Sequence, residues 1–127
     1  MKRNLLTFLI VSVGFLMVSD LLFAHHSAAA YDNAKQVSVT GTVTDFQFVN
    51  PHVLIFMVAK DEGGSIQKWQ GELTSPNHLV RVGWTRGIMK PGDEITLTGY
   101  QSRSGANSLR ITKVVLNGQV LRTSENN

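Results

Sequence analysis

The sequence feature that most constrains the fold is a two-residue alternation of apolar and polar side chains. Over residues 37–44, valines and one glycine occupy the odd positions, and Ser or Thr occupies the even ones. This period places alternate side chains on opposite faces of a β-strand, one of them toward a core. At Phe46 and Phe48 the apolar signal moves to even positions, and a β-bulge near Asp45 would explain the slip. Gly41 inside this strand fits a bend or a close backbone approach.

Further strand patterns follow, separated by turn residues. The segment after Asn50 and Pro51 is apolar on both faces, which indicates a central strand, and later segments alternate again. Gly, Pro, Asn and Asp cluster between these segments, as in turns. We therefore expect strands over residues 37–48, 52–59, 66–73, 94–100 and 108–116, with turns at 61–64, 90–93, 103–107 and 117–118 and a short return strand after the last.

One segment, TSPNHLVRVGW (74–84), predicts a short helix. Thr74 or Ser75 can cap it, Pro76 suits its first turn, and Gly83 suits its end. A helix between the third and fourth of five strands is the arrangement of the OB-fold barrel. We therefore expect an all-β fold with one short helix, a five-stranded OB-like small barrel. A β-sandwich with an accessory helix is the alternative.

The N-terminal segment has the pattern of a targeting signal. The basic start MKRN precedes an uncharged apolar run at 5–18, and small residues follow. We expect cleavage after Ala24, with Ala28 or Ala30 as other positions, and a periplasmic or secreted protein. Retention as an anchor is the alternative, because the apolar run approaches the roughly 20 residues of a membrane span. The expected organisation is a signal peptide at 1–24, an N-terminal arm at 25–36, an OB-like β-barrel domain at 37–122 and a flexible tail at 123–127.

Composition narrows the function classes. The chain has no cysteine, which excludes disulfides, thiolate metal sites and a lipid-modified cysteine. Its formal net charge of +3 is small and its basic residues are scattered, so we expect no nucleic-acid surface. The sequence contains no GxSxG elbow, HExxH, Walker loop, GxGxxG or EF-hand pattern. We therefore expect a protein that is not an enzyme.

The histidines are candidate metal ligands. If cleavage occurs after Ala24, the mature chain begins with His25, whose α-amine and imidazole can bind one metal ion. His52 would supply a third nitrogen, a set that suits copper(II). His26 is a poorer ligand, because adjacent side chains of an extended chain point to opposite sides, and His78 lies on the predicted helix. The alternatives are that His25 and His26 are solvated residues beside a cleavage point, or that they contact a partner.

Three further residues are candidates for binding a ligand: Trp84, Glu72 and Asn50. Trp84 would either cover the open end of the barrel or stack on a planar ligand or sugar. Glu72 would be solvated, or would be a hydrogen-bond partner of His52 or Arg81. Asn50 opens the turn that precedes His52. We expect the side chain of Trp69, on the opposite face of the strand from Glu72, to lie in the core.

The ordered motifs HHS, YD, TGTVTDFQFVNPH, Trp69 with Glu72, GW and KPGD resemble a family of exported bacterial proteins classed only as a domain of unknown function. The matching residues are His25, His26, Ser27, Tyr31, Asp32, Gly41, Asn50, Pro51, His52, Trp69, Glu72, Gly83, Trp84, Pro91 and Gly92. The resemblance implies export and a small β fold, and it implies no activity.

We therefore expect an exported, non-catalytic β-barrel binding module. Its partner would be a small ligand, a glycan or a periplasmic protein, with no nucleic acid and with membrane contact only through the signal segment. The alternative is a periplasmic copper-binding protein that uses the mature N-terminal histidine.

Overall fold

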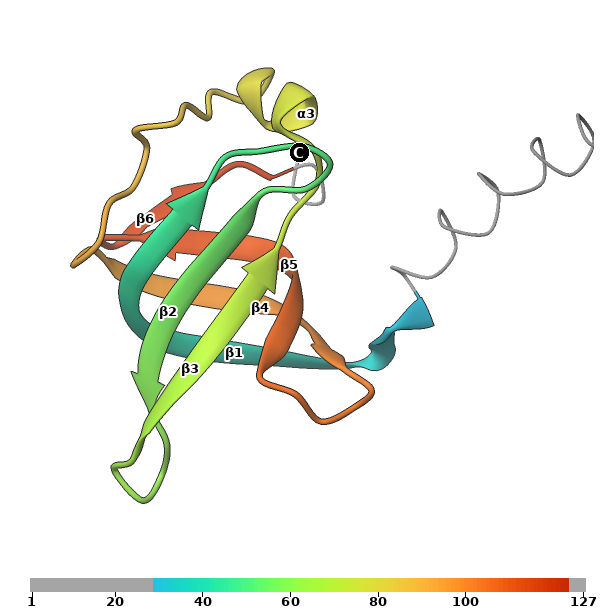
Figure 1. Cartoon of the computed structure of the whole chain (residues 1–127), viewed down its shortest axis with the longest axis vertical. Helices are drawn as coiled ribbons and strands as arrows, with labels where there is room; N and C mark the ends of the chain where they lie inside the picture. The colour runs from blue at the N-terminus through green and yellow to red at the C-terminus, as the bar shows by residue number, and fades with distance from the viewer. Residues whose placement is uncertain (1–28, 124–127) are drawn as a thin grey trace, which may run out of the picture. The chain divides into compact units, whose positions relative to one another are not determined.

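In the part of the chain that the structure describes, the fold consists of six strands and one short helix (Figure 1). The structure is a computed structural model and describes residues 29–123. The chain divides into two units after Ala30, and every element named here belongs to the second unit. In chain order the elements are β1 (Tyr31–Gln47), β2 (Leu54–Lys60), β3 (Ile66–Glu72), α3 (Pro76–Val80), β4 (Glu94–Ser102), β5 (Ser108–Leu116) and β6 (Gln119–Leu121).

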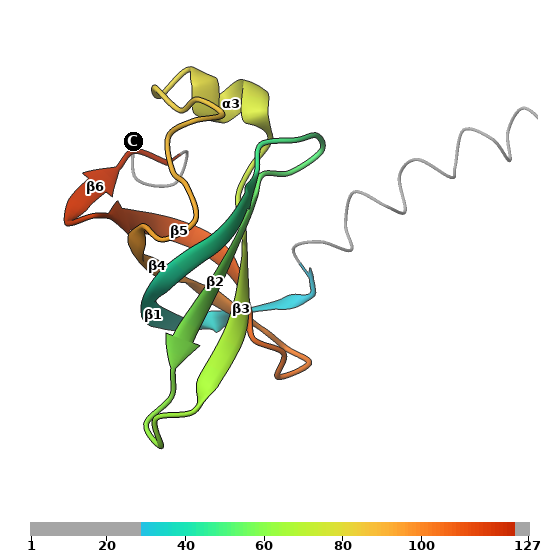
Figure 2. The ribbon, with the colours of Figure 1, turned by 60° about the vertical axis from the view of Figure 1, so that its left-hand side comes forward.

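The strands form one sheet that closes on itself. Its order is β3-β2-β1-β4-β5-β6, and β3 also pairs with β5. The β3–β5 pairing is parallel, whereas the other pairings are antiparallel. Two views of the ribbon show β1 bending around this ring, with α3 over one end and the β2–β3 turn at the other (Figures 1 and 2). The structure thus confirms a mostly antiparallel β fold with one short helix.

The first strand is longer than predicted. It begins at Tyr31, inside the segment that we predicted to be an arm, because Tyr31 pairs with Ser102 of β4 before an irregular stretch that ends at Gln36. The predicted bulge is present, since the register with β2 shifts between Val43 and Asp45. The residues at 31–36 lack an alternating pattern, so only the pairing with β4 reveals that they are in a strand.

The helix is shorter than the predicted segment. It spans Pro76–Val80, with Ser75 at the N-cap position but no capping hydrogen bond from a side chain. After it the backbone turns, and the amides of Gly83 and Trp84 donate to the carbonyl oxygens of Val80 and Leu79. Gly83 has a φ of 97°, a conformation that favours glycine. The turn therefore ends the helix early and directs Leu79 and Trp84 inward.

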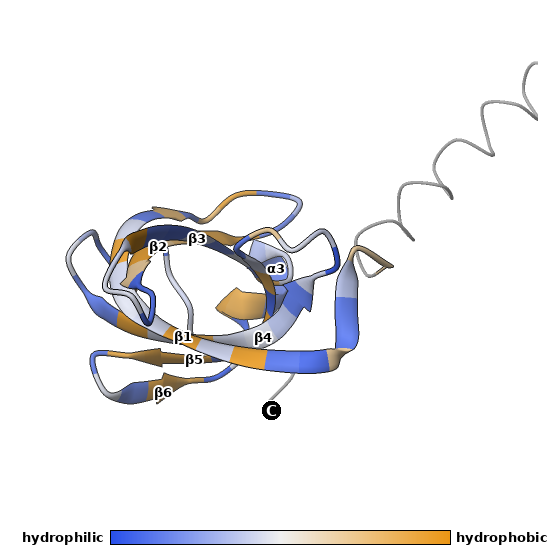
Figure 3. Cartoon of the chain, turned by 90° about the horizontal axis from the view of Figure 1, so that it is seen from below, coloured by the Kyte–Doolittle hydropathy of each residue, from blue (hydrophilic) through white to orange (hydrophobic). Residues whose placement is uncertain are grey.

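The hydrophobic core fills the ring and continues under α3. Figure 3 looks along the ring from the end opposite α3. The buried residues that form the core are Val43, Phe48, Val53, Ile55, Met57, Ala59, Leu73, Leu79, Trp84, Met89, Ile95, Leu97, Leu109, Ile111, Val114 and Leu116.

The C-terminal end differs from the predicted flexible tail in its first residue. Thr123 is fully buried, and its hydroxyl donates to the carbonyl oxygen of Thr112 at 2.9 Å. Residues 124–127 of that predicted tail lie outside the described part of the chain. Within residues 29–123, no helix is both long and apolar enough to cross a membrane.

Candidate functional site

The candidate site forms where the β1–β2 loop meets the end of β3. Val53 is fully buried, and its backbone is hydrogen-bonded to both Leu73 and Thr74, which extends the β2–β3 pairing by one residue. Because successive side chains of extended chains alternate, His52 and Glu72 both emerge on the outer face next to these buried residues. The loop also contains a cis peptide bond between Asn50 and Pro51.

The side chains of His52 and Glu72 lie within hydrogen-bond distance of each other. The Nδ1 atom of His52 lies 2.6 Å from Oε1 of Glu72, a short contact typical of a charge-assisted hydrogen bond. The His52 side chain is 42% exposed and the Glu72 side chain 19%. The structure thus shows one of the two partners, His52, that the sequence offered for Glu72.

Tyr31 binds the other oxygen of the same carboxylate. Its hydroxyl donates to Oε2 of Glu72 at 3.1 Å and lies 3.4 Å from Oγ of Ser108. Burial raises the pKa of the Tyr31 phenol above its ordinary value; the contact with Ser108 opposes this rise, and the negative charge of Glu72 adds to it. Tyr31 therefore stays protonated near neutral pH and acts as a hydrogen-bond donor to Glu72.

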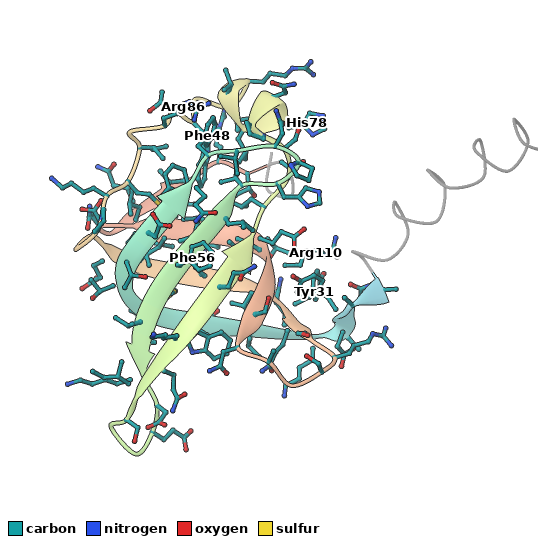
Figure 4. The ribbon with its side chains drawn as sticks, viewed as in Figure 1. Tyr31, Phe48, Phe56, His78, Arg86 and Arg110 are labelled. Atoms are coloured by element: carbon teal, nitrogen blue, oxygen red, sulfur yellow. The ribbon has the colours of Figure 1, made fainter. Side chains whose placement is uncertain are left out.

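The parallel pairing of β3 with β5 completes the cluster. It places Gln70 opposite Ser108 and Glu72 opposite Arg110. Arg110 donates from Nη2 to the side chain of Asn33 at 3.1 Å, and its guanidinium lies 5.0 Å from the ring centre of Tyr100. Figure 4 shows Tyr31 and Arg110 on the same side of the molecule, near the start of β1.

A second arginine also holds the start of β1 in place. Arg103 donates from Nε to the carbonyl oxygen of Tyr31 at 3.0 Å. Tyr31 is therefore held both through its side-chain hydroxyl and through its backbone carbonyl group.

The contact with Glu72 engages one nitrogen of His52 and leaves the other available to a ligand. The Glu72 carboxylate accepts a hydrogen bond from Nδ1–H, so in the neutral imidazole the Nε2 atom carries the lone pair. A carboxylate that accepts a hydrogen bond from Nδ1 in this way fixes the orientation of the imidazole ring, as in many metal sites. The ring can therefore offer Nε2 to a metal ion or to a hydrogen-bond donor.

The structure places the other two predicted ligand-binding residues, Asn50 and Trp84, in different surroundings. Asn50 is exposed in the loop beside His52. Trp84 is only 2% exposed, and its indole N–H donates to the carbonyl oxygen of Arg122 at 2.6 Å. A ring buried in this way presents no face to a ligand, so Trp84 is outside the candidate site and its burial fits a covering role.

The predicted metal ligands are only partly covered by the structure. His25 lies outside the described residues, as does His26. His78 lies on α3, with its Nδ1 atom 3.0 Å from the hydroxyl of Thr74. Among residues 29–123, no group of three His, Cys, Asp or Glu side chains comes close enough to hold a metal ion. A complete metal site at His52 would therefore need a ligand from outside this part of the chain.

Sequence reasoning missed three members of the cluster: Ser108, Arg110 and the hydroxyl of Tyr31 as a partner of Glu72. Ser108 and Arg110 reach the site through the β3–β5 pairing, a contact between segments distant in sequence. No local signal marks such a pairing. The alternation in β5 does place both residues on the outer face, which is the face of Glu72.

The fold and the cluster define a small β-sheet protein with a histidine–carboxylate pair on its surface. Residues 14–110 match a family described as a family of unknown function (DUF6152). The chain belongs to this family, which confirms the resemblance to a family without an assigned function. No curated protein matches the chain.

Proposed function

We propose that this protein is an exported, non-catalytic binding module built on an OB-like barrel, and that a transition-metal ion, copper(II), is its ligand. The strand order, the parallel β3–β5 closure and the helix between β3 and β4 support the OB-like assignment. The observation that carries the ligand is the contact between Nδ1 of His52 and Glu72, which leaves Nε2 of a partly exposed imidazole available to a metal.

The mature N-terminus would supply the remaining ligands. Tyr31 and His52 bind the same carboxylate, so the strand that follows the N-terminal segment starts beside the imidazole. Five residues lie between His25 and Tyr31, and an extended chain covers about 3.3 Å per residue. Cleavage after Ala24 would give His25 a free α-amine, and its two nitrogens with Nε2 of His52 match the nitrogen-rich tetragonal site of copper(II).

The test is copper binding by the mature protein. The secreted chain is purified, its N-terminus is determined by mass spectrometry, and copper(II) affinity is measured by competition with a chelator. We expect the substitution His52→Ala to lower the affinity at least about tenfold. His78→Ala is the matched control, because His78 lies on α3 and outside the cluster.

Two outcomes would refute parts of this proposal. Equal copper affinities of the His52→Ala, His78→Ala and unsubstituted proteins would show that copper binds only weakly to surface histidines. A mature chain that does not begin at His25 would remove the amine from the site, and His52 would then need a different partner.

A further inference from the structure

A groove lies at the end of the ring opposite α3, on the inner side of the strands. Its volume is about 550 Å³, which is within the range of small-molecule sites. Residues of β1, β2, the β2–β3 turn, β3, β4 and the β4–β5 loop line it. In Figure 3 this end of the ring faces the viewer. The groove is separate from the His52 cluster, because Glu72 lies on the outer face of β3.

The inner wall of the groove is apolar and includes an aromatic ring. Val37, Val39 and Ala59 line it together with Trp69. Trp69, which the sequence predicted to lie in the core, packs against the core but is only partly buried. An indole face carries negative charge density and attracts weakly positive C–H groups. Trp69 can therefore stack on a ring that presents C–H groups.

Three side-chain amides surround this apolar wall: Gln67, Gln101 and Asn107. All three residues are half-buried. Within the described residues, no hydrogen bond engages the side-chain amides of Gln101 and Asn107. Each amide has both donors and an acceptor, a combination that matches a hydroxyl group, which also donates and accepts.

The charges at the rim do not favour a polyanion. Lys60 lies beside two carboxylates, Asp61 and Glu62, so the lining carries more negative than positive charge. Asp61 accepts hydrogen bonds from the Ser65 amide at 2.8 Å and from Nε2 of Gln67 at 3.0 Å. These bonds lower the pKa of the Asp61 carboxyl, that from Gln67 most of all. They also order the turn and direct Gln67 before any ligand binds, which reduces the entropy cost of binding.

We propose that this groove binds an uncharged saccharide, with one sugar ring stacked on Trp69 and its hydroxyls hydrogen-bonded to Gln101 and Asn107. A pyranose combines a face of C–H groups with a rim of hydroxyls, which is the chemistry that the wall and the amides recognise. A nucleic acid would place phosphates beside Asp61 and Glu62. The saccharide site is independent of copper binding at His52.

The experiment is an NMR titration of the mature protein with cellohexaose and, separately, with maltohexaose, each to about 10 mM. The two indole N–H signals provide an internal comparison, because Trp69 lines the groove and Trp84 is buried and bonded to Arg122. We expect at least one of the two sugars to shift the Trp69 signal saturably and to leave the Trp84 signal in place.

Four substitutions test where on the protein the sugar binds. Trp69→Ala should weaken sugar binding at least about tenfold, and Asn107→Ala by about two- to tenfold, the size of one hydrogen bond. Asn107→Ala keeps the backbone bond from Gln70 to its carbonyl oxygen, so the fold should persist. Asn77→Ala, at an exposed position of α3, is the matched control and should bind as the unsubstituted protein does. His52→Ala should also leave the sugar response unchanged, which separates this proposal from copper binding.

Three results would overturn the saccharide site. One is the absence of any Trp69 shift with both sugars. Another is tighter binding of a single-stranded oligothymidylate than of either sugar, which would indicate a polyanion site. The third is a concentration-dependent shift of Trp69 without sugar, which would show that a second copy of the chain occupies the groove.

Discussion

The substitution Gly99→Ala tests how closely β4 and β5 approach each other in the ring. Gly99 lies at the register shift between these strands. A Cβ atom built there would meet the carbonyl oxygen of Arg110 and would lie 2.9 Å from Cα of Ile111. Both are backbone atoms, and ordinary contacts of a Cβ begin at 3.4 Å, so the strands would have to separate by at least 0.5 Å. A side-chain rotation cannot relieve such a clash.

The size of the effect follows from the atoms that must move. Overpacking of a core costs about 1–3 kcal/mol, and a backbone clash should lie at the upper end. For a domain of this size, 1 kcal/mol lowers the melting temperature by about 4–8 °C. We therefore expect Gly99→Ala to lower it by more than about 10 °C. Gly71→Ala should cost less, because the nearest atoms to its Cβ would be side-chain atoms of Ile111 and Leu97, which can move more easily than the backbone.

The assay is thermal unfolding followed by circular dichroism, with Gly87→Ala as the matched control. A Cβ at Gly87 would meet nothing within 4 Å, so its stability should change by less than about 0.5 kcal/mol. The reasoning would be refuted if Gly99→Ala melted within a few degrees of Gly87→Ala. A lower melting temperature for Gly71→Ala than for Gly99→Ala would also contradict it.

Three further predictions concern the site, a turn and the core. Glu72→Gln should weaken copper binding about 10- to 100-fold by removing the carboxylate behind His52; an unchanged chelator-competition affinity would contradict this. Hydrogen bonds from the Lys90 amide and from Asn117 lower the pKa of the Asp93 carboxyl, so its ionised form stabilises the fold above about pH 4, and this contribution disappears as the pH falls through the lowered pKa. The melting-temperature difference between the unsubstituted protein and Asp93→Asn should therefore shrink on acidification, and a constant difference would contradict the assignment. Trp84→Phe leaves a carbonyl oxygen without its indole donor and should cost about 1–3 kcal/mol in urea unfolding; a loss below about 0.5 kcal/mol would show that the hydrogen bond contributes little.

Part of the candidate site could be predicted from the sequence. His52 follows a turn marked by Asn50 and Pro51, and Glu72 occupies the outer face of an alternating strand, so both belong to recognisable patterns. Their contact was one of three interpretations of Glu72, beside a solvated side chain and a contact with Arg81, because the partner of Glu72 depends on the pairing of β2 with β3. That pairing places Leu54 opposite Glu72 and so brings the loop residue His52 to the carboxylate.

The sequence indicated the burial of Trp84 better than that of Trp69: covering an end of the ring was one of two interpretations of Trp84, whereas Trp69, expected in the core, is only partly buried. Both follow apolar patterns in the sequence, yet Trp84 is covered and Trp69 lines a groove. The difference arises because the turn after α3 folds Trp84 over one end of the ring, whereas no helix among the described residues covers the other end.

Local periodicity by itself determined the strands, the bulge near Asp45 and the position of the helix, because these features depend on residues that are neighbours in the sequence. Only the tertiary structure decided that β1 begins at Tyr31, that Ser108 lies beside the Tyr31 hydroxyl and that Arg110 lies opposite Glu72. Those contacts arise when β3 and β5 pair in parallel and close the ring. Closure of this kind depends on packing between distant segments, and no short stretch of sequence encodes it.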